Sequence, residues 1–293
     1  MREITLFTHR RPDDTTETLE RLAERASRVG VTLRLDEEET IKHGLQARPG
    51  LELNAPIKQD VELCVVLGGD GTILRALQCY AGTNVPVFAI NFGEIGFLAT
   101  VERGDIDDGI RRALSGDFEL LRLPAIVLEE EGDGSKPRPT PPGASTRTAV
   151  NDVAIHRKVG ERVADIAYAL EGEEVGSVRC DGLVVATPAG STGYNLANGG
   201  PVMAWGVEGF VVSFIAPHSL TARALVVAPD DRLTIFNRSR EPLDVAVDGR
   251  PAGEIPPGAT IEARFVNEVG TIAQLPGSSF YRRLRDKFGR LAS

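Results

Sequence analysis

The chain has 293 residues, enough for two domains of ordinary size or for one large domain. Its hydrophobic fraction of 42% and charged fraction of 26% are typical of a folded globular protein and exclude a disordered, collagenous or fibrous chain. Lys and Arg number 33 against 42 Asp and Glu, and the net charge of −9 makes the surface as a whole a poor partner for nucleic acid or an anionic membrane.

Targeting and redox signals indicate a cytoplasmic protein. No stretch approaches the length of an apolar membrane span, and the segment after Met1 has no signal-peptide core. Cys64, Cys79 and Cys180 lack C-x-x-C spacing and predict buried thiols rather than a disulfide framework or a zinc site. The four histidines are too scattered to predict a metal site.

Strands and helices alternate in the first third of the chain. The apolar pattern predicts strands at 4–7, 31–35, 61–67 and 85–90, and helices at 15–29 and 72–80. Such alternation is typical of parallel βαβ units with right-handed crossovers. We therefore expect an α/β domain over residues 1–122.

After about Leu123 short strands and turns replace this alternation. Strands are predicted at 148–156, 163–170, 178–186, 210–215, 225–228, 233–236, 243–247 and 261–266, with turns at Glu171-Gly172 and Asp248-Gly249. A β-rich second domain over 123–275 follows. Residues 129–147 are rich in Gly, Pro, Ser and charge, which predicts a solvated loop or hairpin tip, with a functional lid as the alternative.

The C-terminal segment has the pattern of an amphipathic helix. Phe280, Leu284 and Phe288 share one helical stripe between residues 279 and 290, and basic residues surround it. We expect the segment 276–293 to pack back on the first domain. A basic contact with phosphate is the alternative.

The sharpest local motif is Gly68-Gly69-Asp70-Gly71-Thr72, placed between a buried strand and the helix expected from Thr72. Glycines at such a turn allow positive φ angles and a close approach to a ligand, and the amides at a helix start favour a phosphate. A carboxylate beside phosphate is costly unless a cation or a proton transfer uses it. Asp70 is therefore the predicted chemical residue, and a tight turn of purely structural importance is the alternative.

Two common phosphate-binding motifs are absent from the sequence. There is no G-x-G-x-x-G, so the usual dinucleotide fingerprint is missing. No lysine follows a glycine, which excludes a Walker A loop.

A second polar constellation begins at Asp181-Gly182 and continues from Thr187 to Tyr194 and on to Gly199-Gly200-Pro201. A buried strand here leads into a loop that is dense in Gly, Ser and Thr, and Tyr194 could lie against a base or a ribose. Alone, this pattern is also compatible with an ordinary loop.

Together these motifs resemble the NAD kinase family, whose members phosphorylate the adenosine-ribose 2′-hydroxyl of NAD with ATP or polyphosphate. The resemblance covers, in order, Gly68 to Thr72, Asn91 with Gly93, Gly96, Phe97 and Leu98, Asn151-Asp152, Asp181-Gly182, Thr187 to Tyr194, Gly199 to Pro201, Pro217 to Leu220, and Val247-Asp248-Gly249. Phe280 to Arg285 is similar to the family's C-terminal segment.

The resemblance implies a Rossmann-like N-terminal domain, a C-terminal β-sandwich, a site in the crevice between them, Mg²⁺ or another divalent cation, and a homodimer or homotetramer. Asp70 would be the catalytic aspartate. Residues implied to bind nucleotide or substrate are Gly68, Gly69, Gly71, Thr72, Arg75, Asn91, Phe97, Asn151, Asp152, Arg162, Arg179, Asp181, Thr192, Gly193, Tyr194, Ala197 and Arg250.

Four positions depart from the family pattern. Ala197 stands where serine is frequent, Arg250 where an amide is frequent, Ala189 where threonine is frequent and Gly193 where alanine is common. These changes leave Asp70 untouched but open the choice of acceptor between NAD, NADH and another nucleotide. A lipid kinase with the same Gly-Gly-Asp-Gly loop and a noncatalytic NAD(P)-binding sensor are the alternatives to an NAD kinase.

Overall fold

The computed structural model of the chain describes residues 2–94, 96–130 and 147–289. It divides into two compact units, Met1–Arg122 with Gly270–Ser293 and Leu123–Val269. The loop or lid predicted at 129–147 falls mainly on 131–146, outside the described residues.

The first unit alternates strands and helices along the chain, as the apolar pattern predicts. Its elements before the chain enters β6 (Glu119–Glu130) are β1 (Arg2–Thr8), η1 (Pro12–Asp14), α1 (Thr16–Arg28), β2 (Val31–Arg34), α2 (Glu37–His43), β3 (Leu51–Glu52), β4 (Leu63–Gly68), α3 (Asp70–Cys79), β5 (Val87–Asn91), η2 (Arg103–Asp105) and α4 (Ile106–Ser115).

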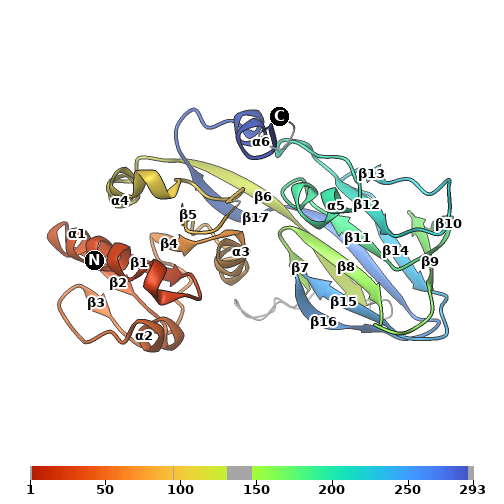
Figure 1. Cartoon of the computed structure of the whole chain (residues 1–293), viewed down its shortest axis with the longest axis horizontal. Coiled ribbons are helices and arrows are strands. Elements are labelled where there is room, and N and C mark those ends of the chain that lie inside the picture. Colours follow the sequence, from red (N-terminus) through yellow and green to blue (C-terminus); the bar gives the residue numbers. More distant parts are fainter. Residues whose placement is uncertain (1, 95, 131–146, 290–293) are drawn as a thin grey trace. The chain divides into compact units, whose positions relative to one another are not determined.

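The strands of this unit form a parallel sheet in the order β3-β2-β1-β4-β5 (Figure 1). The order reverses between β1 and β4, which makes their carboxyl ends the topological switch point where α/β proteins bind ligands. Leu19 and Leu22 on α1 and Ile110 on α4 share one buried core with the sheet. The opposite face carries α3, where the Arg75 guanidinium lies 5.0 Å from the centroid of the Phe7 ring.

The second unit consists almost entirely of strands. Its elements are β6, β7 (Thr148–Ala149), β8 (Asp152–Arg157), β9 (Ala164–Leu170), β10 (Glu173–Cys180), β11 (Gly182–Ala186), η3 (Gly190–Thr192), α5 (Tyr194–Ala197), β12 (Phe210–Ile215), β13 (Leu225–Val227), β14 (Leu233–Asn237), β15 (Leu243–Val247), β16 (Arg250–Ile255) and the first part of β17 (Thr260–Gln274).

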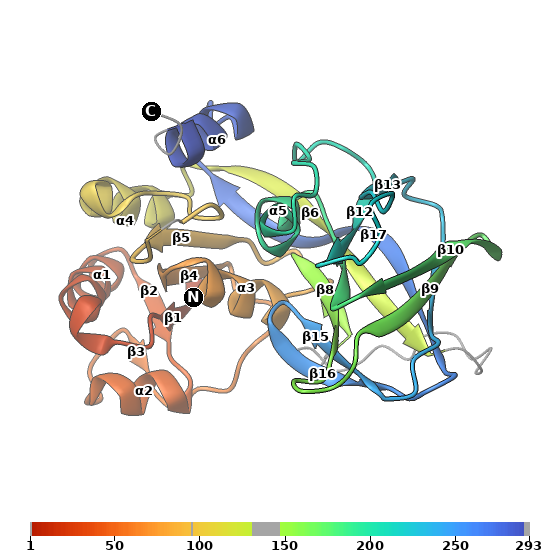
Figure 2. The ribbon, with the colours of Figure 1, turned by 45° about the vertical axis from the view of Figure 1, so that its right-hand side comes forward.

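These strands form two sheets that share one apolar core, which confirms the predicted β-sandwich. One sheet contains β10-β9-β14-β17, and β6 and β7 continue from β17; the other has the order β13-β12-β11-β8-β15-β16. Val153, Val185 and Phe210 from the second sheet pack with Ile166 and Ile235 from the first. Figure 2 shows α5 on the outer face of the second sheet, over β11 and β12. Both predicted turns are present, with positive φ at Glu171-Gly172 and at Asp248-Gly249.

Two of the predicted strands are wrong in the same way. The strands expected at 148–156 and 178–186 are each interrupted, at Val150-Asn151 and at Asp181. At Asp181 the chain passes from β10 in one sheet to β11 in the other, and the continuous apolar pattern cannot reveal such a crossing. Both interruptions fall on predicted site residues.

The C-terminal end returns to the first unit. β17 continues beyond the sandwich, and its Ile272 pairs in parallel with Val87 of β5. The predicted terminal helix is present as α6 (Phe280–Phe288).

Candidate active site

Asp70 lies at the start of α3, at the carboxyl end of β4. The helix begins at Asp70 rather than at the predicted Thr72, with Gly69 as its N-cap. The two carboxylate oxygens accept hydrogen bonds from the backbone amides of Phe97 (2.9 Å) and Leu98 (3.0 Å). These bonds fix the direction of a partly exposed carboxylate at a helix N-terminus, the position where α/β folds bind phosphates.

The glycines of this loop do not adopt the backbone conformation that the sequence predicts. None of Gly68, Gly69 and Gly71 has a positive φ, so the expected left-handed turn is absent. A Cβ placed on Gly93 would lie 2.8 Å from the Cα of Gly69, because the two backbones are in contact. A Cβ on Gly71 would meet no atom within 4 Å. The loop therefore needs glycine for close packing on one side, and it leaves open space beside Asp70 on the other.

Three residues of this unit that were predicted to bind nucleotide instead have side chains that contact other residues of the protein. The Asn91 amide accepts from Gly93 N and donates to Glu102, both at 2.9 Å. Phe97 is buried. Arg75 pairs with Glu38 at 2.7 Å and with Asp36 at 3.5 Å. The structure thus gives these side chains internal partners around the glycine loop.

In the second unit, the turn at 150–152 is held by Asp248. Its Oδ1 accepts hydrogen bonds from the amides of Asn151 (2.7 Å) and Asp152 (3.1 Å), and its Oδ2 accepts from Val150 N (3.0 Å). Asp248 has a φ of 46°, a left-handed conformation that aspartate tolerates. Three amides left without strand partners at the break between β7 and β8 are satisfied in this way.

Asp152 carries a buried carboxyl group with an unusual affinity for protons. Burial, reinforced by the negative charge of Asp248, raises the pKa of Asp152 to about 7. A Cβ on Gly193 would lie 3.9 Å from Asp152 Oδ2, so this carboxyl group faces the Gly193 backbone. Perturbed carboxyl groups of this kind are frequent at functional sites.

The loop from Thr187 to Tyr194 packs directly on the same turn. Thr187 N donates to Asn151 O at 2.9 Å, and a Cβ on Gly190 would lie 2.1 Å from that oxygen. Thr192 Oγ1 donates to Ala189 O at 3.1 Å. Tyr194 stacks on His156 with ring centroids 5.6 Å apart. The structure thus brings the Asn151-Asp152 pair next to the Gly193-Tyr194 pair, although the sequence places the two pairs about 40 residues apart.

Asp181 occupies the second interrupted strand. Its carboxylate accepts from Arg157 Nε at 2.6 Å, and this ion pair lowers the pKa of Asp181. Gly182, the first residue of β11, pairs with His156, so Asp181 immediately precedes the strand that pairs with the Tyr194-stacking histidine. Ala197 and Arg250 are both exposed, at the end of α5 and the start of β16.

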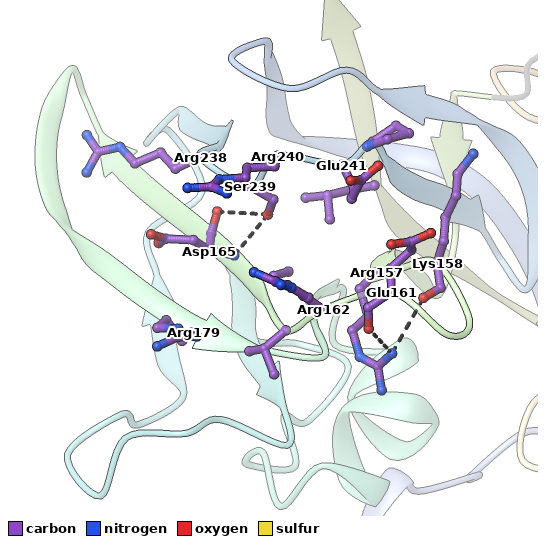
Figure 3. A pocket seen from close by; sticks show the side chains of 14 residues that line it. Arg157, Lys158, Glu161, Arg162, Asp165, Arg179, Arg238, Ser239, Arg240 and Glu241 are labelled. Atoms are coloured by element: carbon purple, nitrogen blue, oxygen red, sulfur yellow. Dashed lines mark hydrogen bonds between the residues drawn. The ribbon is translucent and has the colours of Figure 1, made fainter.

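Arg162 and Arg179 line a cavity of about 610 Å³ at the base of β9 and β10, together with Arg157, the ion-pair partner of Asp181 (Figure 3). Ser239 lies on its wall, accepting from Asp165 N at 2.9 Å. Six basic and three acidic residues line this cavity, a local excess of positive charge in a chain of net charge −9. Such a cavity suits an anionic ligand.

Sequence reasoning missed three supporting side chains. Asp248 belongs to a predicted hairpin turn and to a motif shared with the family, but no role was predicted for it, and Arg157 follows the strand predicted at 148–156. Glu102, which accepts from Asn91, follows no recognisable motif. Each acts through a partner distant in sequence, so only the three-dimensional arrangement reveals it.

The site carries no resident metal cage in its described part. Within residues 2–94, 96–130 and 147–289, no group of three His, Cys, Asp or Glu side chains could hold a metal ion. In the same ranges, no helix is long and apolar enough to cross a membrane.

Fold and site together define a phosphotransferase with a Rossmann-like unit and a β-sandwich unit. Comparison with known proteins identifies the family. The ATP-NAD kinase N-terminal domain matches residues 4–118, and the ATP-NAD kinase C-terminal domain matches residues 150–268. The chain therefore belongs to the NAD kinase family, and it is a kinase that transfers phosphate to NAD.

Individual relatives agree with this assignment. The chain is 36% identical over 233 residues to the NAD kinase of Gemmatimonas aurantiaca, covering 78% of each chain. It is 30% identical over 297 residues to the NAD kinase of Lachnoclostridium phytofermentans, covering 99% of each.

Solved structures have the same fold. An NAD kinase from Archaeoglobus fulgidus in complex with ATP matches with a TM-score of 0.73 and 25% identity, over 100% of this chain and 99% of that one. Yeast NADH kinase complexed with NADH matches with a TM-score of 0.84 and 22% identity, over 100% and 89%.

Proposed function

We propose that the chain transfers the terminal phosphoryl group of ATP or polyphosphate to the 2′-hydroxyl of the adenosine ribose of NAD, giving NADP. The observation that carries this reaction is Asp70: a carboxylate oriented by two backbone amides, at the start of α3, beside open space at Gly71. The loop amides and the helix N-terminus suit the donor phosphates.

Asp70 has the geometry of a proton acceptor. Each of its oxygens accepts one hydrogen bond from a backbone amide. A carboxylate oxygen can accept a second hydrogen bond, which leaves room for one from a substrate hydroxyl. Phosphoryl transfer proceeds through a loose transition state, so orientation of the hydroxyl contributes more than strong basicity. Asp70 would orient the 2′-hydroxyl and take its proton as the new P–O bond forms and the bond from the terminal phosphorus to the departing ADP or shortened polyphosphate breaks.

The second unit would supply the acceptor-binding residues. Asn151 Oδ1 is buried without a hydrogen-bond partner in the described structure, although the neighbouring backbone is fully engaged. An unsatisfied acceptor of this kind suits an amino or hydroxyl group of a bound nucleotide. Asp152, Asp181 and the Thr192 to Tyr194 segment would add contacts to ribose and base, and Arg162, Arg179 and Arg250 to phosphates.

Mg²⁺ is proposed as part of the donor rather than as a resident cofactor. Mg²⁺ is usually held by one or two carboxylates together with substrate phosphates. The absence of a three-residue cluster from the described part of the chain fits this mode of binding. Bound to the phosphates, the ion would offset their charge.

A homodimer or homotetramer in the cytoplasm completes the proposal. Free cysteines, two of them buried, are compatible with a reducing compartment. Sedimentation of the full chain would measure the oligomeric state, and a single monomeric species would contradict this part of the proposal.

The reaction is tested by coupling the product to an NADP-specific dehydrogenase. The full chain is assayed with NAD or NADH as acceptor and with ATP or polyphosphate as donor, beside the Asp70→Asn variant; the dehydrogenase reduces NADP formed from NAD and, with its oxidised substrate, oxidises NADPH formed from NADH. We expect NADP from the wild type and a loss of at least about 100-fold in kcat for the variant. Full turnover by Asp70→Asn would refute the role of Asp70, and failure on both acceptors would refute the reaction.

A further inference from the structure

The C-terminal helix contacts the turn that holds Asp70. Arg283 on α6 donates through Nη1 to the carbonyl oxygens of Phe97 (2.7 Å) and Ala99. The amide of Phe97 is one of the two that bind the Asp70 carboxylate. The turn from Phe97 to Ala99 therefore binds Asp70 through its amides and Arg283 through its carbonyl groups.

Arg283 is deeply placed for an arginine. Burial lowers its pKa, opposed by the negative charges of Glu102 and Asp70. Taking part of a guanidinium out of water is costly unless its donors find partners, and here Nη1 donates to two backbone carbonyl groups. Such a residue holds one geometry rather than sampling many.

A second connection from α6 reaches the same loop. Lys287 donates to Glu102 Oε1 at 2.7 Å, and Asn91 donates to Glu102 Oε2 at 2.9 Å. Asn91 in turn accepts from the amide of Gly93, the residue whose backbone touches Gly69. Both connections end at the glycine loop, one at the Asp70 carboxylate and the other at the Gly69 backbone.

Aromatic packing fixes the helix to this turn. The Phe97 ring lies 6.0 Å from the Phe280 ring and 5.8 Å from the Phe288 ring, measured between centroids. The first and last residues of α6 thus contact the same side chain, which sets the rotation of the helix and directs Arg283 to the carbonyl groups.

We propose that α6 positions the catalytic carboxylate, with Arg283 as the positioning residue that acts through the 97–99 turn. The inference rests on the role proposed above for Asp70. Its consequence is that kcat depends on a side chain that touches no substrate. A misplacement of about 1 Å at a reacting group costs on the order of 100-fold in rate.

The test compares Arg283→Met with Arg282→Met, a neighbouring arginine on the same helix whose side chain is exposed. We expect Arg283→Met to lower kcat about 10- to 100-fold with the KM values for NAD and ATP nearly unchanged. Arg283→Lys, which keeps the charge and one donor nitrogen, should recover part of the loss, and Arg282→Met should match the wild type. A folded Arg283→Met enzyme with wild-type kcat would overturn the proposal.

Two further measurements separate positioning from a general loss of structure. Hydrogen exchange at the Phe97 and Leu98 amides should accelerate in Arg283→Met while exchange in β8 and β11 stays unchanged; unchanged exchange at 97–98 would overturn the proposal. In the Asp70→Asn background, Arg283→Met should cause little further loss, because residues that act as one unit are not additive. An equal further loss would assign Arg283 a role independent of Asp70.

The outcomes distinguish this inference from the proposed function. Full turnover by Asp70→Asn alone would refute the role of Asp70 and this inference with it, whereas additive losses refute the inference alone. Should Arg283→Met fail to fold, Lys287→Met carries the test, because it breaks only the connection through Glu102. For Lys287→Met, a drop in kcat smaller than the one expected for Arg283→Met supports the proposal, and an unchanged kcat overturns it.

Discussion

Asp248 and Asp152 are hydrogen-bonded in both directions. Asp248 N donates to Asp152 O at 2.9 Å, and Asp248 Oδ1 accepts from Asp152 N at 3.1 Å. A hairpin turn between β15 and β16 thereby fixes the first residue of β8. The proximity of the two carboxyl groups also raises the proton affinity of the buried one.

Replacing Asp248 tests whether this turn shapes the acceptor site. Asp248→Asn retains the left-handed turn but loses the charge and directs an amide group at backbone donors. We expect a loss of about 2 kcal/mol in the free energy of unfolding and a KM for NAD raised about tenfold, with the KM for ATP unchanged. Asp244→Asn, at an exposed position on the preceding strand β15, is the control. An unchanged KM for NAD would contradict the prediction.

The raised pKa of Asp152 predicts how the stability of the protein depends on pH. Its folded-state pKa of about 7 lies above the ordinary value of 3.8, so folding favours the protonated form. The stability that depends on this group is present below pH 4 and declines as the pH rises toward 7. Asp152→Asn should therefore stabilise the protein at pH 8 more than at pH 5, by about 3 kcal/mol. Urea unfolding at both pH values measures this difference, and parallel pH profiles for both proteins would refute the raised pKa.

Gly190 is predicted to be irreplaceable for a steric reason. A Cβ at this position would overlap Asn151 O at 2.1 Å, and that oxygen belongs to the backbone, which cannot rotate away. Gly190→Ala should cost about 3 kcal/mol or more of stability or displace the 150–152 turn. Gly206→Ala, which meets no atom within 4 Å, should be close to neutral in thermal unfolding. Equal melting temperatures for the two variants would show that the loop yields without cost.

Arg250 is the departure from the family pattern with the clearest test. It is exposed beside the Asp248-Gly249 turn. If its charge contacts an acceptor phosphate, Arg250→Gln should raise the KM values for both NAD and NADH about 5- to 10-fold and reduce their dependence on salt. A change in the ratio between the two acceptors would instead assign Arg250 to discrimination between them. Identical kinetics would remove Arg250 from the site.

The apolar pattern sufficed for β1, β2, β4 and β5 of the parallel sheet, for α1 and α3, and for most strands of the sandwich, but it did not predict the short edge strand β3. It failed at Asn151 and Asp181, where polar residues interrupt otherwise continuous strands, because periodicity does not record which sheet a strand joins. Helices α2 and α4 were not predicted, although α4 packs Ile110 and Leu114 on the sheet.

The residues of the candidate site also fall into two groups, those that a contiguous motif predicts and those that act on groups distant in sequence. Asp70 was predicted from one contiguous motif. Arg283 and Asp248 could be assigned no role from sequence, since each acts on backbone groups about 100 residues or more away. The prediction of positive φ in the glycine loop was wrong because its glycines serve close packing instead.

The placement of α6 has a consequence for biosynthesis. Arg283 lies in α6, 186 residues beyond the Phe97 turn that it holds. A ribosome therefore produces the glycine loop long before the helix that steadies it. A nascent chain in which α6 has not yet been made would carry the proposed phosphate-binding residues of the glycine loop, yet its 97–99 turn would lack Arg283, so full activity should arise only after α6 has been translated.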